Sequence, residues 1–258
     1  MSEFIGHLQD KIWLVIIICS ATGYFIGAIS FARFINYMVL KTTKISKFSE
    51  PVPHSDEIFE SDLVSATLVT KKLGFRYGCM TSLLDMLKVA LPTLFIKLTF
   101  AAHPFFLLTA LFGIIGHNYP VYYRFVGGRG ESPIIGALLI INWFGILIAN
   151  AGATVLGFIT GSVLVVRWGG YSILIFWFWY YFNDIFYVAF MVLANFFFYM
   201  AMGKDLMRFR ELKVKKGINF TEEDVSEFIL MGRSLGRALD KYSLYHFIKR
   251  WLNKKKKN

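Results

Sequence analysis

The feature that most constrains this chain is the length of its apolar runs. The stretch from Pro133 to Val166 stays apolar for 34 residues, and the stretch from Trp168 to Met202 carries a single charged residue, Asp184. One α-helix of that length would measure roughly 50 Å, whereas the hydrocarbon core of a bilayer is about 30 Å thick and takes about 20 residues. Each run must therefore turn once and supply two membrane-spanning helices.

The other apolar runs complete an all-α, polytopic bundle. Ile12–Ala32 has spanning length, Cys79–Phe95 supplies a second span, and Phe105–Ile115 forms the core of a third. The polar and aromatic segment Asn142–Gly145 divides the first long run into a short fourth span and a full-length fifth. With a turn at Asp184 in the second long run, we expect about seven transmembrane helices. The polar segment Arg33–Tyr77 is expected to be a long loop.

The charge is concentrated at one end of the chain. Of the net charge of +11, residues 203–258 contribute +8, from 15 Lys or Arg and 7 Asp or Glu. Because this excess lies beside a membrane, anionic headgroups are a nearer partner than nucleic acid. Lys and Arg collect in alternate loops, so the positive-inside rule predicts an external N-terminus. We expect a multi-pass domain of the cell membrane over residues 1–203, with its active loops on the cytoplasmic face, and a basic cytoplasmic tail over 204–258.

The tail contains two helix signals. Thr221–Asp224 fits a capping box, which predicts the start of a soluble helix. Apolar residues from Leu244 to Trp251 then recur at helical spacing among basic residues that continue to Lys257, as in a basic helix that lies in the membrane interface. Docking of this helix on the protein's own cytoplasmic loops is the alternative.

The most specific chemical signal is Gly116–Pro120 followed by Phe125–Gly130. Residues without a Cβ allow consecutive backbone N–H groups to converge on an anion, and a guanidinium can donate two parallel hydrogen bonds to phosphate oxygens. The glycines around Arg129 therefore predict a phosphate-binding loop. The alternative is a tight glycine turn in which Arg129 contacts lipid headgroups.

Three further ionisable residues are candidates for the same site. His117 is a possible general base, because imidazole titrates near neutral pH, although a histidine beside a turn can also be structural. Asp85 and Lys88 lie three residues apart in the second span, where charged groups are costly and usually face a polar interior. The pair either lines the substrate site or neutralises itself.

These residues resemble those of the acyl-phosphate-dependent glycerol-3-phosphate acyltransferases of bacterial membranes, over roughly residues 20–205. The family's third motif has glycine-histidine, a proline, then phenylalanine and Gly-Gly-Lys-Gly. It is matched, with arginine in place of lysine, by Gly116, His117, Pro120, Phe125, Gly127, Gly128, Arg129 and Gly130. The second-helix signature is matched by Asp85, Leu87, Lys88 and Pro92. The resemblance implies a seven-helix enzyme with three cytoplasmic motifs.

Two motifs depart from the family's pattern. The first, Gly-Ser-Ile-Pro-Phe, reads Gly-Ala-Ile-Ser-Phe at Gly27–Phe31, so its hydroxyl moves to Ser30. The second motif is Gly-Ser-Gly-Asn followed by Gly-Ala-Thr-Asn in the family. Its two halves correspond here to Glu60–Leu63 and Ser65–Leu68, and each ends in leucine where the family has asparagine. The loop before it, Lys41–Glu60, is longer than usual. Hydroxyl groups that can still line the site, or can bond to nearby backbone instead, remain at Ser61, Ser65 and Thr67.

The resemblance implies acyl transfer from acyl phosphate to glycerol 3-phosphate, which gives lysophosphatidic acid for phospholipid synthesis. The predicted catalytic residues are His117, Arg129 and Ser30, and the predicted substrate-binding residues are Ser61, Ser65, Thr67, Asp85, Lys88, Asn118, Gly127, Gly128 and Gly130. The expected partners are the two substrates and membrane lipids, with no metal, cofactor or nucleic acid and with the oligomeric state left open. The departures favour the alternative, a non-catalytic or transport protein that binds a phosphorylated metabolite or lipid.

Overall fold

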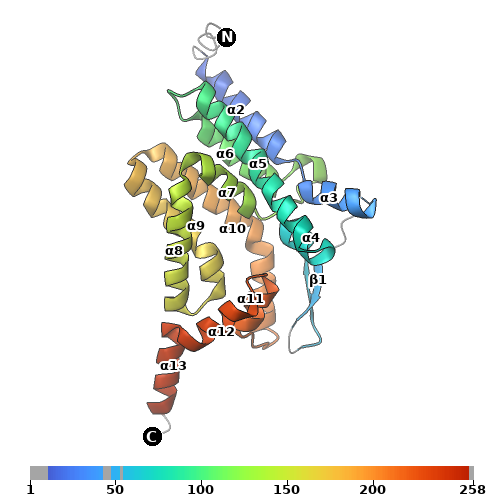
Figure 1. Cartoon of the computed structure of the whole chain (residues 1–258), viewed down its shortest axis with the longest axis vertical. Coiled ribbons are helices and arrows are strands. Elements are labelled where there is room, and N and C mark those ends of the chain that lie inside the picture. The colour runs from blue at the N-terminus through green and yellow to red at the C-terminus, as the bar shows by residue number, and fades with distance from the viewer. Residues whose placement is uncertain (1–10, 43–47, 53–54, 256–258) are drawn as a thin grey trace. The chain divides into compact units, whose positions relative to one another are not determined.

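The structure, a computed structural model, describes residues 11–42, 48–52 and 55–255. Within these residues the chain is helical apart from one β-hairpin (Figure 1). Six helical segments of the described chain are long and apolar enough to cross a membrane, as expected of a multi-pass membrane protein. They are Ile12–Leu40, Phe75–Thr99, Phe105–Tyr123, Trp143–Thr160, Val163–Phe182 and Ile185–Val214. Residues 43–47 and 53–54 of the predicted loop, and Lys256 and Lys257 of the predicted basic run, lie outside the described residues.

The elements follow one another in the order seen in Figure 1. They are α2 (Ile12–Gly27), α3 (Phe31–Leu40), β1 (Phe48–Pro51), β2 (Ile58–Ser61), α4 (Ala66–Leu73), α5 (Phe75–Thr99), α6 (Phe105–Asn118), the 3-10 turn η1 (Val121–Tyr123), α7 (Glu131–Ile141), α8 (Trp143–Thr160), α9 (Val163–Phe182), α10 (Ile185–Val214), α11 (Glu222–Phe228), α12 (Arg233–Tyr242) and α13 (Leu244–Lys255).

The predicted turns inside both long apolar runs are confirmed. Helix α7 ends at Ile141 and α8 begins at Trp143, while α9 ends at Phe182 and α10 begins at Ile185. The short fourth span corresponds to α7, whose 11 residues would cover about 16 Å, roughly half of a hydrocarbon core. A seventh span at α7, and the external position of the N-terminus, stay predictions.

The described chain forms two compact units. Of the described residues, the first unit contains 11–42, 48, 60–143 and 184–204, and the second contains 49–52, 55–59, 144–183 and 205–255. Helix α10 continues through the predicted domain boundary between residues 203 and 204. That boundary stays a prediction.

Helices α2 and α6 of the first unit approach closely because glycines line their contact. A Cβ on Gly23 would lie 2.2 Å from the carbonyl oxygen of Thr109, and a Cβ on Gly27 would lie 2.2 Å from that of Gly113. The two glycines are four residues apart and so lie on one face of α2, the spacing that lets membrane helices pack backbone against backbone. This contact fixes the end of α6, where the candidate site begins.

The first predicted span, Ile12–Ala32, lies within the apolar helical segment Ile12–Leu40, which is long enough to cross a membrane and which contains a break between α2 and α3. Helix α2 ends at Gly27, and Ser30 caps the N-terminus of α3, where its hydroxyl accepts a hydrogen bond from the backbone N–H of Arg33. A serine that bonds to the backbone in this way favours a new helix start over a continuous helix. The break leaves the carbonyl group of Ile29 outside the helical ladder.

The polar segment Arg33–Tyr77, predicted as a loop, is largely structured. It contains α3, α4 and the two-stranded hairpin β1-β2, in which the N–H of Val52 bonds to the carbonyl of Glu57 at 2.8 Å. Sequence reasoning missed the hairpin because its strands have only four residues each, which is too short for a clear alternation of apolar and polar positions.

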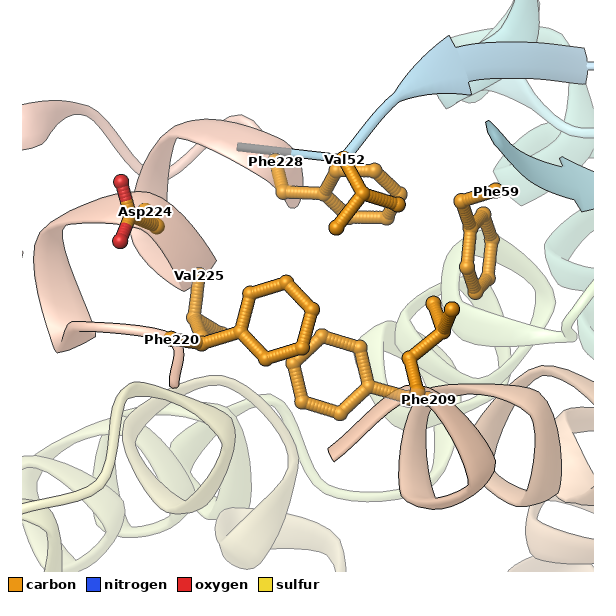
Figure 2. A pocket seen from close by; sticks show the side chains of 8 residues that line it. Val52, Phe59, Phe209, Phe220, Asp224, Val225 and Phe228 are labelled. Carbon is orange, nitrogen blue, oxygen red and sulfur yellow. The ribbon is translucent and has the colours of Figure 1, made fainter. Parts of the chain in front are cut away.

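The hairpin packs on the tail within the second unit through aromatic side chains. The rings of Phe59 and Phe228 meet edge to face with centroids 4.8 Å apart, and Phe209 and Phe220 stack at 4.6 Å. Figure 2 shows these rings gathered around a small apolar pocket with Asp224 at its margin. None of the predicted site residues lines this pocket.

The capping box at the start of the tail is confirmed, and it orients α11. The hydroxyl of Thr221 accepts from the N–H of Asp224, whose carboxylate accepts from the N–H of Thr221. The next residue, Glu222, accepts a 2.7 Å hydrogen bond from the N–H of Val163 at the start of α9, and Arg167 donates to the carbonyl of Ile229. The first part of the tail is therefore docked on α9.

Candidate functional site

The glycine-rich loop between α6 and α7 folds back over the end of α6. The N–H of Gly128 donates to the carbonyl of His117 at 3.1 Å. A Cβ on Gly127 would lie 2.1 Å from that carbonyl oxygen, and a Cβ on Gly128 would lie 2.1 Å from the imidazole Nε2. Both glycines are therefore required by close packing, and the N–H of Gly128 is occupied by the loop itself. At this position the tight-turn interpretation is supported.

The other end of the loop keeps the features of an anion site. Gly130 has φ +88 and forms the N-cap of α7, so Arg129 directly precedes a helix of 11 residues. The first N–H groups of a helix have no partner within it, and its dipole is positive at this end. Arg129 is half-buried between two buried glycines. A phosphate placed here would meet a guanidinium and a helix N-terminus together.

Lys88 ties three segments together beneath this loop. Its ammonium Nζ donates to the carbonyl of Ile29 at 2.6 Å, and it lies 2.9 Å from Nδ1 of His117 and 2.8 Å from Oδ1 of Asp85. The contacts with Ile29 and His117 are hydrogen bonds, and the contact with Asp85 is an ion pair whose Oδ1 accepts no hydrogen bond among the described residues. Since the side chain is 2% exposed, the geometry favours a structural role over the predicted contact with substrate.

His117 is held from two sides. It is 8% exposed, its Nδ1 faces the ammonium of Lys88, and its Nε2 lies under Gly128. A neutral imidazole that accepts a hydrogen bond at Nδ1 carries its proton on Nε2. In that tautomer the ring has no lone pair left for a general base, so the geometry favours positioning of the glycine-rich loop.

Asn118 offers an acceptor that the described residues leave unused. The residue is 2% exposed, and its Nδ2 donates to the carbonyl of Phe197 on α10 at 3.2 Å. Its Oδ1 is buried without a hydrogen-bond partner among the described residues. A buried acceptor left unpaired costs about 1–3 kcal/mol. The oxygen lies beside Gly130, where a Cβ would approach it to 2.6 Å, which points to a donor group of a ligand at this loop.

Arg33 is a site residue that sequence reasoning missed. Its Nη2 donates to the carbonyl of Val126 in the glycine-rich loop at 3.1 Å, and its Nη1 lies 3.4 Å from the hydroxyl of Ser30. The guanidinium also lies 4.3 Å from the centre of the Tyr123 ring. In the sequence, Arg33 contributed only to the loop charge, although its position three residues after the hydroxyl of the first motif could have identified it. It places a second half-buried cation at the loop.

The second motif also reaches the loop, through the backbone. The N–H of Val64 donates to the carbonyl of Gly127 at 2.9 Å, which brings the neighbouring hydroxyl residues to the site. The hydroxyl of Ser61 accepts from the N–H of Leu63, and that of Ser65 caps α4. Thr67 lies in the first turn of α4. For both serines the local backbone role is observed, and contact with substrate stays a prediction.

Comparisons of the sequence with known proteins show which family the chain resembles. Residues 17–210 match the family model described as glycerol-3-phosphate acyltransferase. A glycerol-3-phosphate acyltransferase of Legionella pneumophila is 34% identical over 137 residues, which are 53% of this chain and 45% of that protein. One from Oceanobacillus iheyensis is 40% identical over 87 residues, which are 30% of this chain and 42% of that protein. The chain thus spans less than half the length of these curated relatives.

Two crystal structures show the same fold. They are the lysophosphatidic acid form and the glycerol 3-phosphate form of PlsY, an integral membrane glycerol 3-phosphate acyltransferase. Each has a TM-score of 0.59 and 20% sequence identity, and each alignment covers 76% of this chain and 91% or 92% of the other. The family match ends at residue 210, so most of the tail lies beyond it.

Proposed function

Because the chain belongs to the glycerol-3-phosphate acyltransferase family, we propose that it transfers a fatty acyl group from acyl phosphate to a hydroxyl of glycerol 3-phosphate. The hydroxyl oxygen forms an ester bond with the acyl carbonyl carbon, and the bond from that carbon to the phosphate oxygen breaks. Phosphate leaves with the electron pair, and it can accept the hydroxyl proton. The products are lysophosphatidic acid and inorganic phosphate.

The observation that carries the proposal is that three segments bond to the glycine-rich loop, through Arg33, Val64 and His117, and that Arg33 and Arg129 bring two guanidinium groups to it. Arg33 donates to the carbonyl of Val126, and Arg129 lies at the N-terminus of α7. The reaction brings together two phosphorylated substrates, and an arginine can bind each phosphate through paired hydrogen bonds. We assign one phosphate to Arg129 with the helix N-terminus and the other to Arg33.

Asn118 is the residue we assign to the acceptor hydroxyl. Its buried Oδ1 can accept the hydroxyl proton of glycerol 3-phosphate in a hydrogen bond, while its Nδ2 is fixed on Phe197. A hydroxyl held in this way is aimed by an amide that cannot rotate freely. Because phosphate is a good leaving group, orientation of this kind supplies much of the catalysis.

The remaining polar residues of the site position these groups. Lys88, with Asp85, holds His117 and the carbonyl of Ile29, and the hydroxyl of Ser30 faces Arg33. We therefore assign Lys88, His117 and Ser30 to placement of the loop and of Arg33. On the positive-inside rule we place the loop at the cytoplasmic face of the cell membrane.

The test is a direct assay of purified protein in micelles. Labelled glycerol 3-phosphate is supplied with acyl phosphate or with acyl-CoA, and lysophosphatidic acid is measured. Arg129→Ala should lower the rate by roughly 100-fold or more, the usual loss for one donor to a developing negative charge. Arg124→Ala is the matched control, because Arg124 is an exposed cation in the same loop and should retain activity.

Three results would change the proposal. Full activity of Arg129→Ala would remove Arg129 from the site. Product with acyl-CoA alone would change the donor. Product from neither donor, together with calorimetric binding of glycerol 3-phosphate, would support the alternative of a binding or transport protein.

A further inference from the structure

The tail divides into a docked part and an uncovered part. Helices α11 and α12 include buried residues such as Val225 and Leu239, and Glu222 bonds to the first N–H of α9. Helix α13 contains no buried residue at all. Docking on the chain itself therefore describes α11 and α12, whereas in this structure nothing covers α13.

Helix α13 has a continuous apolar face. At 100° per residue its large apolar side chains fill an arc of about 160°. All of them are exposed by 45–61%: Leu244, Tyr245, Phe247, Ile248, Trp251 and Leu252. A soluble surface seldom carries six large apolar side chains side by side, and such a patch marks an interaction site.

The charges of α13 indicate the kind of surface that it meets. On the same helical wheel, Lys249 and Lys254 lie at the two margins of the apolar arc, and Arg250 lies near the opposite face. Lys255, in the last turn, falls within the arc, where its ammonium lies 5.0 Å from the centre of the Trp251 ring. Helix α13 contains no acidic residue. Cations at the margins can extend to headgroup phosphates while the apolar arc enters the acyl boundary. A protein partner that covered only the apolar arc would leave these charges in water. Anionic lipid is the better match.

The start of α13 lies at the level where headgroups are expected. Helices α8 and α9 have 18 and 20 residues, so a membrane that they span has its surface near their connection. Gly161 lies in that connection, and a Cβ there would be 3.0 Å from the hydroxyl of Ser243 and 2.9 Å from Nδ1 of His246. The first turn of α13 therefore touches the end of the spanning hairpin.

We propose that α13 binds the surface of a bilayer that contains anionic lipids, with its apolar arc in the interface and Lys249 and Lys254 on lipid phosphates. In Figure 1, α13 runs from α12 away from α8 and α9, so binding requires a turn about Ser243, the single residue between α12 and α13. The hydrogen bonds from Arg250 to the carbonyls of Asp240 and Lys241 stabilise the observed angle between α12 and α13.

Amide hydrogen exchange of the whole protein in nanodiscs tests the proposal. Discs of phosphatidylcholine alone are compared with discs that also contain phosphatidylglycerol, and exchange is followed over residues 244–255. We expect exchange to be slower by about tenfold or more with phosphatidylglycerol. In discs with phosphatidylglycerol, Lys249→Gln and Lys254→Gln should each raise the exchange rate of these amides by about fivefold, which corresponds to the usual contribution of one lysine beside an anionic surface.

The controls separate the lipid from other occupants. Lys241→Gln removes an exposed cation from α12 and should leave the protection of α13 unchanged. Phe247→Ser with Trp251→Ser should abolish the protection, because it removes the centre of the apolar arc. Equal exchange in both kinds of disc would overturn the proposal. A second result would also overturn it. If α13 were protected equally in both kinds of disc, but only in discs that hold two copies of the protein, its apolar arc would be covered by a second chain and not by lipid.

Discussion

The cations beneath the glycine-rich loop and the cations of α13 obey opposite rules. Lys88 is 2% exposed, and its ammonium has two hydrogen-bond acceptors and one carboxylate partner, all within 2.9 Å. The lysines of α13 lie on an exposed helix without acidic neighbours in that helix. In a region of low dielectric an unpaired charge is very costly, so partners are fixed atom by atom. At a surface, exposed charges need no fixed partner, so the contribution of the α13 cations depends on their total charge and on the helix face that carries them.

Removal of the buried cation gives the largest expected effect. Lys88→Met leaves the carboxylate of Asp85 buried without its closest partner, 2.8 Å away. We expect a loss of about 3–5 kcal/mol in the free energy of unfolding, the usual result of breaking a buried pair on one side. Thermal unfolding in detergent measures this. Lys88→Met with Asp85→Asn should recover part of the loss, and an unchanged melting temperature in the single variant would contradict the assignment.

A methyl group under the loop tests how closely the loop and His117 are packed. Gly128→Ala would place a Cβ 2.1 Å from Nε2 of His117, and overpacking of this kind costs about 1–3 kcal/mol. We expect at least a tenfold lower rate of acyl transfer, because the loop must move. Gly203→Ala is the matched control, since a Cβ there meets nothing within 4 Å; equal activity of the two variants would disprove close packing at Gly128.

Arg33→Lys keeps the charge but removes the planar group. The bond to Val126 and the stacking on Tyr123 depend on the guanidinium shape, so lysine is not an equivalent substitution. We expect about a tenfold rise in KM for one of the phosphorylated substrates, with a smaller change in kcat. Steady-state kinetics with each substrate varied in turn would show it. An unchanged KM for both substrates would remove Arg33 from phosphate binding.

The docked part of the tail should show a pH dependence from Glu222. Burial raises the pKa of its carboxyl group above the usual 4.5, and Asp240 adds to the rise, while the hydrogen bond from Val163 and the charges of His246 and Lys213 oppose it. The unfolded chain loses this proton near pH 4.5, and the folded chain holds it to higher pH. The free energy of unfolding should therefore fall as the pH rises through that window. Glu222→Gln should reduce this slope in thermal denaturation.

The surface cations should give the smallest effect on catalysis. Lys249→Gln with Lys254→Gln should leave acyl transfer in micelles unchanged within about twofold, because exposed charges of this kind contribute little to the fold. The same assay that serves for Arg129→Ala measures it. A large loss in micelles would show that α13 contributes to the catalytic site, and its cations would then not act only at the surface.

The sequence alone determined the features that depend on neighbours along the chain. Run length predicted the breaks at Asn142 and Asp184, because a bilayer limits how long an apolar helix can be. The spacing of Thr221 and Asp224 predicted a helix start, because a capping box is closed within four residues. The glycine-rich loop was found for the same reason, since its residue types are unusual within one short segment.

Only the tertiary structure decided which groups meet across the fold. Lys88 bonds to a carbonyl 59 residues away, and Arg33 bonds to one 93 residues away. No periodicity in the sequence encodes such distances, because they depend on how closely α2, α5 and α6 pack. For the same reason the sequence left His117 open between base catalysis and a structural role, and the structure places it between Lys88 and Gly128. Local spacing sets elements, and packing of the elements sets which donors and acceptors remain for a substrate.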